Sequence, residues 1–401
     1  MKTNRILGGL SVLAIFLVMI SCGGGSTANS GGGVGGSGII SRGSISEFGS
    51  IIVNGTEFDT ISAIVLVNGE TVGTGDAAVQ SYLDEGKVVT VKGTIGEDEE
   101  SAVAERVIYR SEVEGPISNV SGSGPDERQL EVMGQTVMVN FMTNLHDDFD
   151  LDDIALNMVV EVSGFYDDQG TVWATFLEEK GTYLENTLYE VKGFVEALDD
   201  PQPEMFQING LNVSYASADM SGLPDGLLEN GMLVEAIGKV DAAFTLMLAD
   251  QVALEDDLEF ENAEEVEVMG FVTAKAAADE FTVGSQVVMV EDGAVFVDGV
   301  QIDIVPGVKL EAEGELVDGI LWAYEIEFWE PDQFEIEGLV TDFVSESEFT
   351  VDGQIINTTP ETVFEDGEPS DLANGINVEI KGRADGDVMV ADKVSFELGD
   401  I

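Results

Sequence analysis

The densest group of potential ligands in the sequence is the acidic run at residues 147–153, which reads DDFDLDD. Hard cations such as Ca²⁺ are bound by several carboxylate oxygens, so Asp148, Asp150 and Asp152 are candidate ligands. The run does not follow the EF-hand loop, because it lacks glycine at the sixth position and its twelfth residue, counted from Asp148, is Val159. The pattern favours the alternative, a solvated loop that leads into a helix N-terminus, where carboxylates are favourable.

His146, the only histidine of the chain, precedes this run. Histidine titrates near neutral pH, so it could sense pH or take part in catalysis, although an isolated histidine is more commonly a loop residue. A His/Cys zinc site would need ligands that the chain lacks, and no nucleophile-elbow, P-loop or dinucleotide-binding pattern occurs. A hydrolase built from two carboxylates stays open, but the sequence does not single out a pair among 78 acidic residues.

Three tryptophans could form a surface on which sugars stack: Trp173, Trp322 and Trp329. Trp322 shares a predicted apolar face with Tyr324, Ile326 and Phe328, which indicates a core position. Trp329 falls on the opposite face, so it is the better surface candidate, with packing against the following module as the alternative.

The first residues predict an export signal and a lipid anchor. Lys2 and Arg5 precede an apolar run at residues 6–20, which is shorter than a membrane span and typical of a signal-peptide core. The sequence Met19-Ile20-Ser21-Cys22 resembles a bacterial lipobox, so we expect residues 1–21 to be removed and Cys22 to be lipidated. The alternative is an ordinary secretory signal with a chance cysteine. Residues 22–40 are rich in Gly and Ser and are predicted to be a flexible tether.

The chain is strongly acidic, with a formal net charge of −62 from 16 basic and 78 acidic residues. Such a surface repels nucleic acid, while the 44% of hydrophobic residues is enough to build folded cores. We therefore expect no nucleic-acid partner. The expected partners are the membrane, through the lipid anchor at Cys22, and an unknown envelope or extracellular partner. By resemblance to Gram-negative lipoproteins, glycine rather than Asp at position 23 favours the outer membrane, so the predicted location is the cell envelope.

A single motif occurs five times along the chain. Its strands and connections must position the candidate acidic residues, His146 and the tryptophans. Each copy has a glycine-containing strand, a hairpin, a short polar or helical connection, an alternating strand that ends in glycine, and an Ala-x-x-aliphatic strand. The connection ends in glycine in four copies and in Asn157 in the remaining one, as a left-handed position requires. The alternating strands end at Gly93, Gly164, Gly238, Gly314 and Gly382. The predicted modules are residues 41–115, 116–188, 189–263, 264–332 and 333–401.

These patterns predict an all-β protein: a tandem array of five small OB-fold-like β-barrel modules, each with a short helical turn. The motif resembles the bacterial domain of unknown function 5666. The resemblance covers roughly residues 41–401 and is clearest in copies three to five, while copy two departs at Met133-Gly134 and in the segment NFMTNLHDDFD. The family brings no established activity, so the resemblance implies no functional residue.

The combined observations favour a non-enzymatic, lipid-anchored envelope protein with a binding, adhesion or structural role. Two alternatives remain: a carbohydrate- or calcium-binding accessory lipoprotein, and a carboxylate-only hydrolase. No cofactor is expected apart from Ca²⁺ at residues 147–153.

Overall fold

The computed structural model describes residues 38–47, 50–95, 101–122, 127–140, 143–146, 149–199, 202–255, 258, 260, 262–329, 333–351, 353–365, 367–385 and 388–396. Across these residues the protein is all-β, with a single α-helix and four short 3₁₀ turns. No helix within the described ranges is both long and apolar enough to cross a membrane.

The fifth module shows the architecture of each unit most simply, as a closed barrel of five strands in the order β25-β26-β27-β29-β28. Its third and fifth strands run parallel, and all its other neighbours are antiparallel. The core residues of the barrel, among them Val340, Phe349 and Ile380, are fully buried. The elements are β25 (Gln333–Ser345), β26 (Glu348–Val351), β27 (Gln354–Glu365), η4 (Pro369–Asp371), β28 (Asn377–Asp385) and β29 (Val388–Phe396).

The other four modules repeat this order, with a helix or 3₁₀ turn between the third and fourth barrel strands. The first contains β1 (Gly38–Glu47), β2 (Ile51–Val53), β3 (Thr56–Asp59), β4 (Ile64–Val67), β5 (Glu70–Thr74), α1 (Asp76–Tyr82), β6 (Val88–Ile95) and β7 (Ser101–Tyr109). The second contains β8 (Val113–Ser121), β9 (Glu127–Val132), β10 (Gln135–Asn140), β11 (Asn144–Leu145), η1 (Leu151–Asp153), β12 (Met158–Tyr166) and β13 (Val172–Thr182).

The third and fourth modules complete the chain up to the fifth. The third contains β14 (Tyr189–Phe194), β15 (Met205–Ile208), β16 (Leu211–Ser214), β17 (Asp219–Gly222), η2 (Pro224–Gly226), β18 (Leu233–Val240) and β19 (Leu246–Leu254). The fourth contains β20 (Ala263–Lys275), β21 (Glu280–Val283), β22 (Gln286–Val297), η3 (Gln301–Asp303), β23 (Lys309–Val317) and β24 (Ile320–Trp329). Three strands do not follow the predicted boundaries. β1 begins inside the predicted tether, β8 crosses the limit set between residues 115 and 116, and β20 begins one residue before the limit set between residues 263 and 264.

A single β-bulge explains both the closing glycine and the Ala-x-x-aliphatic signature. In every module the register between the fourth and fifth barrel strands shifts by one residue at that glycine, as between Lys381 and Gly382. The bulge inserts one residue opposite the glycine, so an alanine and an aliphatic residue three positions apart both face the core. A Cβ on Gly382 would lie 2.4 Å from the carbonyl oxygen of Val390, so only glycine fits.

Each connection ends, as predicted, in a residue whose backbone adopts the left-handed conformation. Gly86, Asn157, Gly231, Gly307 and Gly375 have φ values between 65° and 89°. Each donates its backbone N–H at 2.8 to 2.9 Å to a carbonyl of the first strand of its own barrel or, in the third module, to that of Val195, the residue directly after the first strand. The same hydrogen bond therefore ties the connection to the first strand, or to the residue after it, in all five modules. The hairpin of the second module also keeps the shared geometry, because Met133 adopts φ 47° before Gly134.

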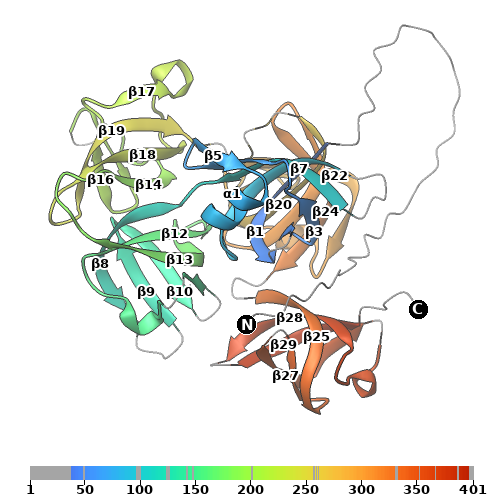
Figure 1. Cartoon of the computed structure of the whole chain (residues 1–401). Helices are drawn as coiled ribbons and strands as arrows, with labels where there is room; N and C mark the ends of the chain where they lie inside the picture. Colours follow the sequence, from blue (N-terminus) through green and yellow to red (C-terminus); the bar gives the residue numbers. More distant parts are fainter. Residues whose placement is uncertain are drawn as a thin grey trace, which may run out of the picture.

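The modules are joined by shared sheets rather than strung as separate beads. Strand β1 pairs in parallel with β20, which joins the first module to the fourth, and β8 pairs with β14 in antiparallel orientation, which joins the second to the third. A small apolar cluster that includes Val88, Phe165 and Phe271 connects the first, second and fourth modules. Figure 1 shows strands of the first (blue) and fourth (orange) modules packed together, with the fifth (red) beside them.

Candidate functional site

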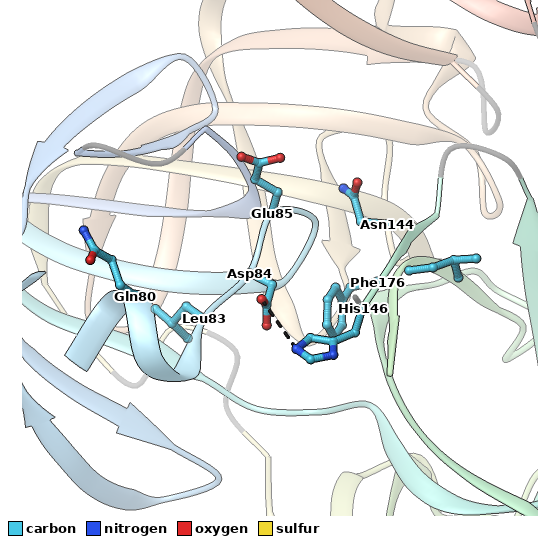
Figure 2. A pocket seen from close by; sticks show the side chains of 8 residues that line it. Gln80, Leu83, Asp84, Glu85, Asn144, His146 and Phe176 are labelled. Atoms are coloured by element: carbon cyan, nitrogen blue, oxygen red, sulfur yellow. Dashed lines mark ion pairs between the residues drawn. The ribbon is translucent and has the colours of Figure 1, made fainter. Parts of the chain in front are cut away.

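The first and second modules meet around a pocket of about 340 Å³ (Figure 2). The loop after α1 contributes one wall, and β11 and β13 of the second module contribute the other. His146 and Asp84 point toward one another across the pocket, with 4.0 Å between His146 Nε2 and Asp84 Oδ1. The lining residues are Gln80, Leu83, Asp84, Glu85, Asn144, Leu145, His146 and Phe176.

A close backbone approach positions the two walls. A Cβ on Gly86 would lie 2.3 Å from the carbonyl oxygen of Thr175, which is the bulged residue of β13. The left-handed glycine that ends the α1 connection therefore also lets the first module dock on the second. On the opposite wall, the backbone N–H of His146 donates to Leu177 O at 3.0 Å, and its ring packs edge-on against Phe176.

Beneath the pocket lies a buried lysine, Lys87, whose side chain is 5% exposed. Its Nζ is 3.0 Å from Asp84 Oδ2 and 3.7 Å from Glu161 Oε1, and it lies over the ring of Phe176 at 4.6 Å. It also donates to the carbonyl oxygen of Tyr82 at 3.2 Å. The charge of Lys87 is thus matched by carboxylates from both modules, so it fixes their relative position.

The chemistry of the described lining fits binding better than covalent catalysis. An imidazole and two carboxylates face an open, mainly polar pocket, but the lining offers no hydroxyl or thiol nucleophile. Within the described part of the chain, no group of three or more His, Cys, Asp or Glu side chains is placed to hold a metal ion. The arrangement suits a small polar ligand that carries a positive charge or donates hydrogen bonds to carboxylates.

A second buried carboxylate lies where the first module meets the fourth. Glu267, on β20, is 4% exposed, and Thr56 Oγ1 of the first module donates to it at 3.3 Å. Burial raises the pKa of Glu267 to about 8, and the neighbouring carboxylates of Glu313 and Glu265 add to this rise. The carboxyl group therefore retains its proton at neutral pH, which removes one negative charge from a crowded junction.

The junction between the second and third modules contains a similar group with a compensating lysine. Burial and the carboxylate of Glu235 raise the pKa of Glu190 to about 8, and Ser111 Oγ donates to Glu190 at 3.1 Å. Burial by itself lowers the pKa of Lys192, but Glu255 at 3.2 Å and other carboxylates outweigh burial and raise it. These side chains are enclosed between barrels, so they set the docking geometry rather than meet a ligand.

The predicted calcium ligands are only partly within the described residues. Asp148 lies outside them. Asp150 and Asp152 are exposed, and Asp152 Oδ1 accepts a hydrogen bond from Arg128 Nη2 at 2.8 Å. The backbone N–H of Asp150 donates to the carboxylate of Asp153 at 3.1 Å, at the start of η1. These contacts suit the alternative of a helical N-terminus, and the Ca²⁺ site stays a prediction. Cys22 and the tether up to residue 37 also lie outside the described residues.

The exposures of two tryptophans are the reverse of our prediction. Trp322 is 38% exposed, whereas Trp329 is 9% exposed. The predicted common face is broken because the bulge inserts Tyr324 opposite Gly314. Alternation along β24 therefore changes phase at Tyr324: Trp322 lies on the outer face, while Ile326 beyond the bulge is fully buried.

Two of the tryptophans pack between modules, which was the stated alternative for Trp329. The Trp329 ring lies 4.3 Å from Lys381 Nζ of the fifth module and 5.4 Å from Lys309 Nζ. The Trp173 ring, in the second module, lies 6.0 Å from that of Phe271 in the fourth. The three tryptophans thus occupy separate places and do not form one stacking surface.

Comparison with known families gives a partial match along the chain. Residues 114–178, 269–327 and 337–395 match the family described as Domain of unknown function (DUF5666). The matched segments lie in the second, fourth and fifth modules. The matches include the second module, which we expected to depart from the motif, but not the third, where we expected a clear likeness. No curated protein matches the chain.

Sequence reasoning did not find the junction residues Asp84 and Lys87, although one signal was available. Lys87 follows the left-handed Gly86, and the other modules have an apolar residue at that position: Met158, Met232, Val308 and Ile376. A charged residue in an otherwise apolar column indicates a buried, paired charge.

Proposed function

We propose that the protein is a lipid-anchored, acidic scaffold of the cell envelope, with a non-enzymatic structural or binding role. The observation that carries this proposal is the pair of shared sheets, β1–β20 and β8–β14, through which the first strands of different barrels hydrogen-bond to each other. Such joints fix the spacing and orientation of the barrels, which a scaffold needs. The lipobox-like sequence at Cys22 and the net charge of −62 support an exported, membrane-tethered location.

Fixed spacing can be tested by pulsed dipolar spectroscopy on the full chain with Cys22→Ser. Spin labels at Ser81→Cys and Ala278→Cys, which are exposed on the first and fourth modules and so span the β1–β20 joint, should give one narrow distance distribution. A matched pair, Ser81→Cys with Ser347→Cys, reports on the fifth module, which shares no sheet with the others among the described strands. We expect a broader distribution for this pair. A broad distribution for the first pair would contradict a rigid scaffold.

The anchor is tested separately by metabolic labelling. Wild-type cells supplied with radiolabelled palmitate should incorporate it into this protein, and the Cys22→Ser variant should not be labelled. Equal labelling of both proteins would rule out the lipid anchor at Cys22. The spin-label experiment tests the rigid scaffold independently of that result.

A second candidate function, carbohydrate binding, is favoured by the outer face of β24. Trp322 and Tyr324 are both nearly 40% exposed there, and Tyr324 Oη donates to Glu313 Oε1 at 2.6 Å. Exposed aromatic rings beside carboxylates can stack on sugar rings and accept hydrogen bonds from their hydroxyl groups. Titration with envelope glycans should quench tryptophan fluorescence in the wild type but much less in Trp322→Phe. A Trp173→Phe variant is the control. Equal quenching in all three proteins would exclude the outer face of β24 as the glycan-binding site.

A further inference from the structure

The scaffold role makes no use of the pocket between the first and second modules. Gln80, Asp84 and Glu85 line it from the first module, and Asn144 and His146 line it from the second. A molecule held there contacts both modules. The volume of about 340 Å³ has room for about ten non-hydrogen atoms, if each takes about the 30 Å³ that a water molecule occupies in the liquid. The pocket therefore suits a small molecule.

The charged side chains that line or adjoin the pocket carry more negative than positive charge. Lys87 Nζ lies within 4.0 Å of three carboxylates, and Lys180 Nζ lies 3.2 Å from two of them. The lysines are Lys87 and Lys180, and the carboxylates are Asp84, Glu85, Glu161 and Glu178. Together these two lysines and four carboxylates have a formal charge of −2, which attracts a cation and repels an anion.

Lys87 shows how this lining binds an ammonium group. Its Nζ is 3.0 Å from Asp84 Oδ2, donates to the carbonyl oxygen of Tyr82 at 3.2 Å and lies over the Phe176 ring at 4.6 Å. The second carboxylate oxygen, Asp84 Oδ1, points across the pocket to His146 Nε2 at 4.0 Å (Figure 2). These two atoms are too far apart for a direct hydrogen bond, but one nitrogen beside the line that joins them can lie about 2.9 Å from both. In the tautomer with its proton on Nδ1, the imidazole accepts a hydrogen bond from that nitrogen.

We propose that the pocket binds a small aliphatic diamine, with one ammonium group between Asp84 and His146 and the other at Glu85 and Asn144. Figure 2 shows Glu85 and Asn144 apart from the Asp84–His146 pair, at another side of the pocket. The Glu85 carboxylate and the side-chain oxygen of Asn144 both accept hydrogen bonds from N–H groups. A diamine thus places one cation at each of two sets of acceptors.

Other classes of small ligand match the lining less well. Leu83 and Phe176, which are 3% and 1% exposed, form an apolar base on which a methylene chain can pack, and a metal ion makes no use of such a base. Within the described ranges, no group of three or more His, Cys, Asp or Glu side chains is placed to hold a metal ion. An anion would meet the surplus negative charge. A diamine satisfies both the carboxylates and the apolar base.

Isothermal titration calorimetry of the full-length chain in non-ionic detergent at 0.15 M NaCl tests this site, with 1,5-diaminopentane as the probe. The wild type should bind one molecule per chain in a saturable manner. The uncharged analogue 1,5-pentanediol should bind at least about tenfold more weakly, because it forms no charge-assisted hydrogen bonds with the carboxylates. Equal binding of the diol would overturn the proposal.

Two lysine variants separate the pocket from the general charge of the chain. Gln80→Lys places a tethered ammonium group at the pocket wall, so it should raise the Kd of the diamine at least about tenfold. Ser81→Lys makes the same change of charge at the next position of α1, which does not line the pocket, and should leave the Kd within about twofold of the wild-type value. Equal Kd values in these two variants would show that the diamine is only a counter-ion of an acidic chain, and the proposal would be wrong.

Asp84→Asn removes the carboxylate at the centre of the site and should also raise the Kd at least about tenfold. Asp225→Asn, at an exposed position of the third module, is its matched control and should bind as the wild type does. Matching far-ultraviolet circular dichroism spectra will show that the variants are folded. If Asp84→Asn does not fold, because Lys87 loses a partner, the comparison of Gln80→Lys with Ser81→Lys decides. The absence of saturable binding in the wild type would overturn the proposal directly.

Discussion

Glu267 should make this protein less stable as the pH rises from about 5 to 8. Its pKa is raised from 4.5 to about 8 in the folded chain because it is buried between the first and fourth modules. Between these values the native carboxyl group keeps its proton, while the unfolded one has lost it. The native state binds more protons, so the free energy of unfolding falls as pH rises.

The size of the effect follows from the shift. Each pKa unit corresponds to about 1.4 kcal/mol, so Glu267 accounts for a loss of about 3 to 5 kcal/mol across this pH range. Glu190 has a similarly raised pKa and contributes in the same direction. In Glu267→Gln the side chain can still accept the hydrogen bond from Thr56, but it does not ionise. We therefore expect the pH slope to fall by up to about half, since Glu267 is one of two groups whose pKa is raised to about 8 and Glu114, Glu265 and Glu325 also have raised pKa values.

Urea unfolding at pH 5, 6.5 and 8, at constant ionic strength, measures the slope directly. Glu346→Gln, at an exposed position of the fifth module, is the matched control and should retain the wild-type slope. If Glu267→Gln and wild type lose stability equally between pH 5 and 8, ionisation of Glu267 does not cause the pH dependence of the free energy of unfolding, and the prediction is wrong.

Three further predictions address the barrels and the charge. Gly382→Ala should destabilise the fifth module by about 1–3 kcal/mol, because the new Cβ meets the carbonyl oxygen of Val390; a melting temperature equal to that of wild type would contradict this. Lys87→Met should lower the free energy of unfolding by about 3 kcal/mol, since it leaves Glu161 with one fewer cation, and urea denaturation will measure the loss. The melting temperature should rise with NaCl because screening weakens self-repulsion, and an additional rise with Ca²⁺ at matched ionic strength would support the site at residues 147–153.

Local sequence signals predicted the barrels well because their constraints are local. A left-handed backbone is required at Gly86 and at the equivalent positions, and only a few residue types adopt it. The crowded backbone at each bulge likewise requires glycine. The exposure of Trp322 was wrongly predicted because strict alternation was assumed across the bulge at Tyr324. The OB-fold-like character of the modules, and the extent of the repeat beyond the three matched segments, stay predictions.

The joints between modules could not be predicted, because partner choice between strands depends on surfaces far apart in sequence. Strand β1 pairs with β20 more than 200 residues later, and nothing in either strand alone specifies that choice. The pocket with Asp84 and His146 exists only because the second module docks on the first, so its residues had no common signal.

The pairing of modules also explains how an acidic chain of small barrels avoids exposing strand edges. Each barrel leaves half of its first strand unpaired, which invites aggregation. The chain satisfies four such edges internally, through a nested arrangement in which the second and third modules join each other inside the first–fourth pair.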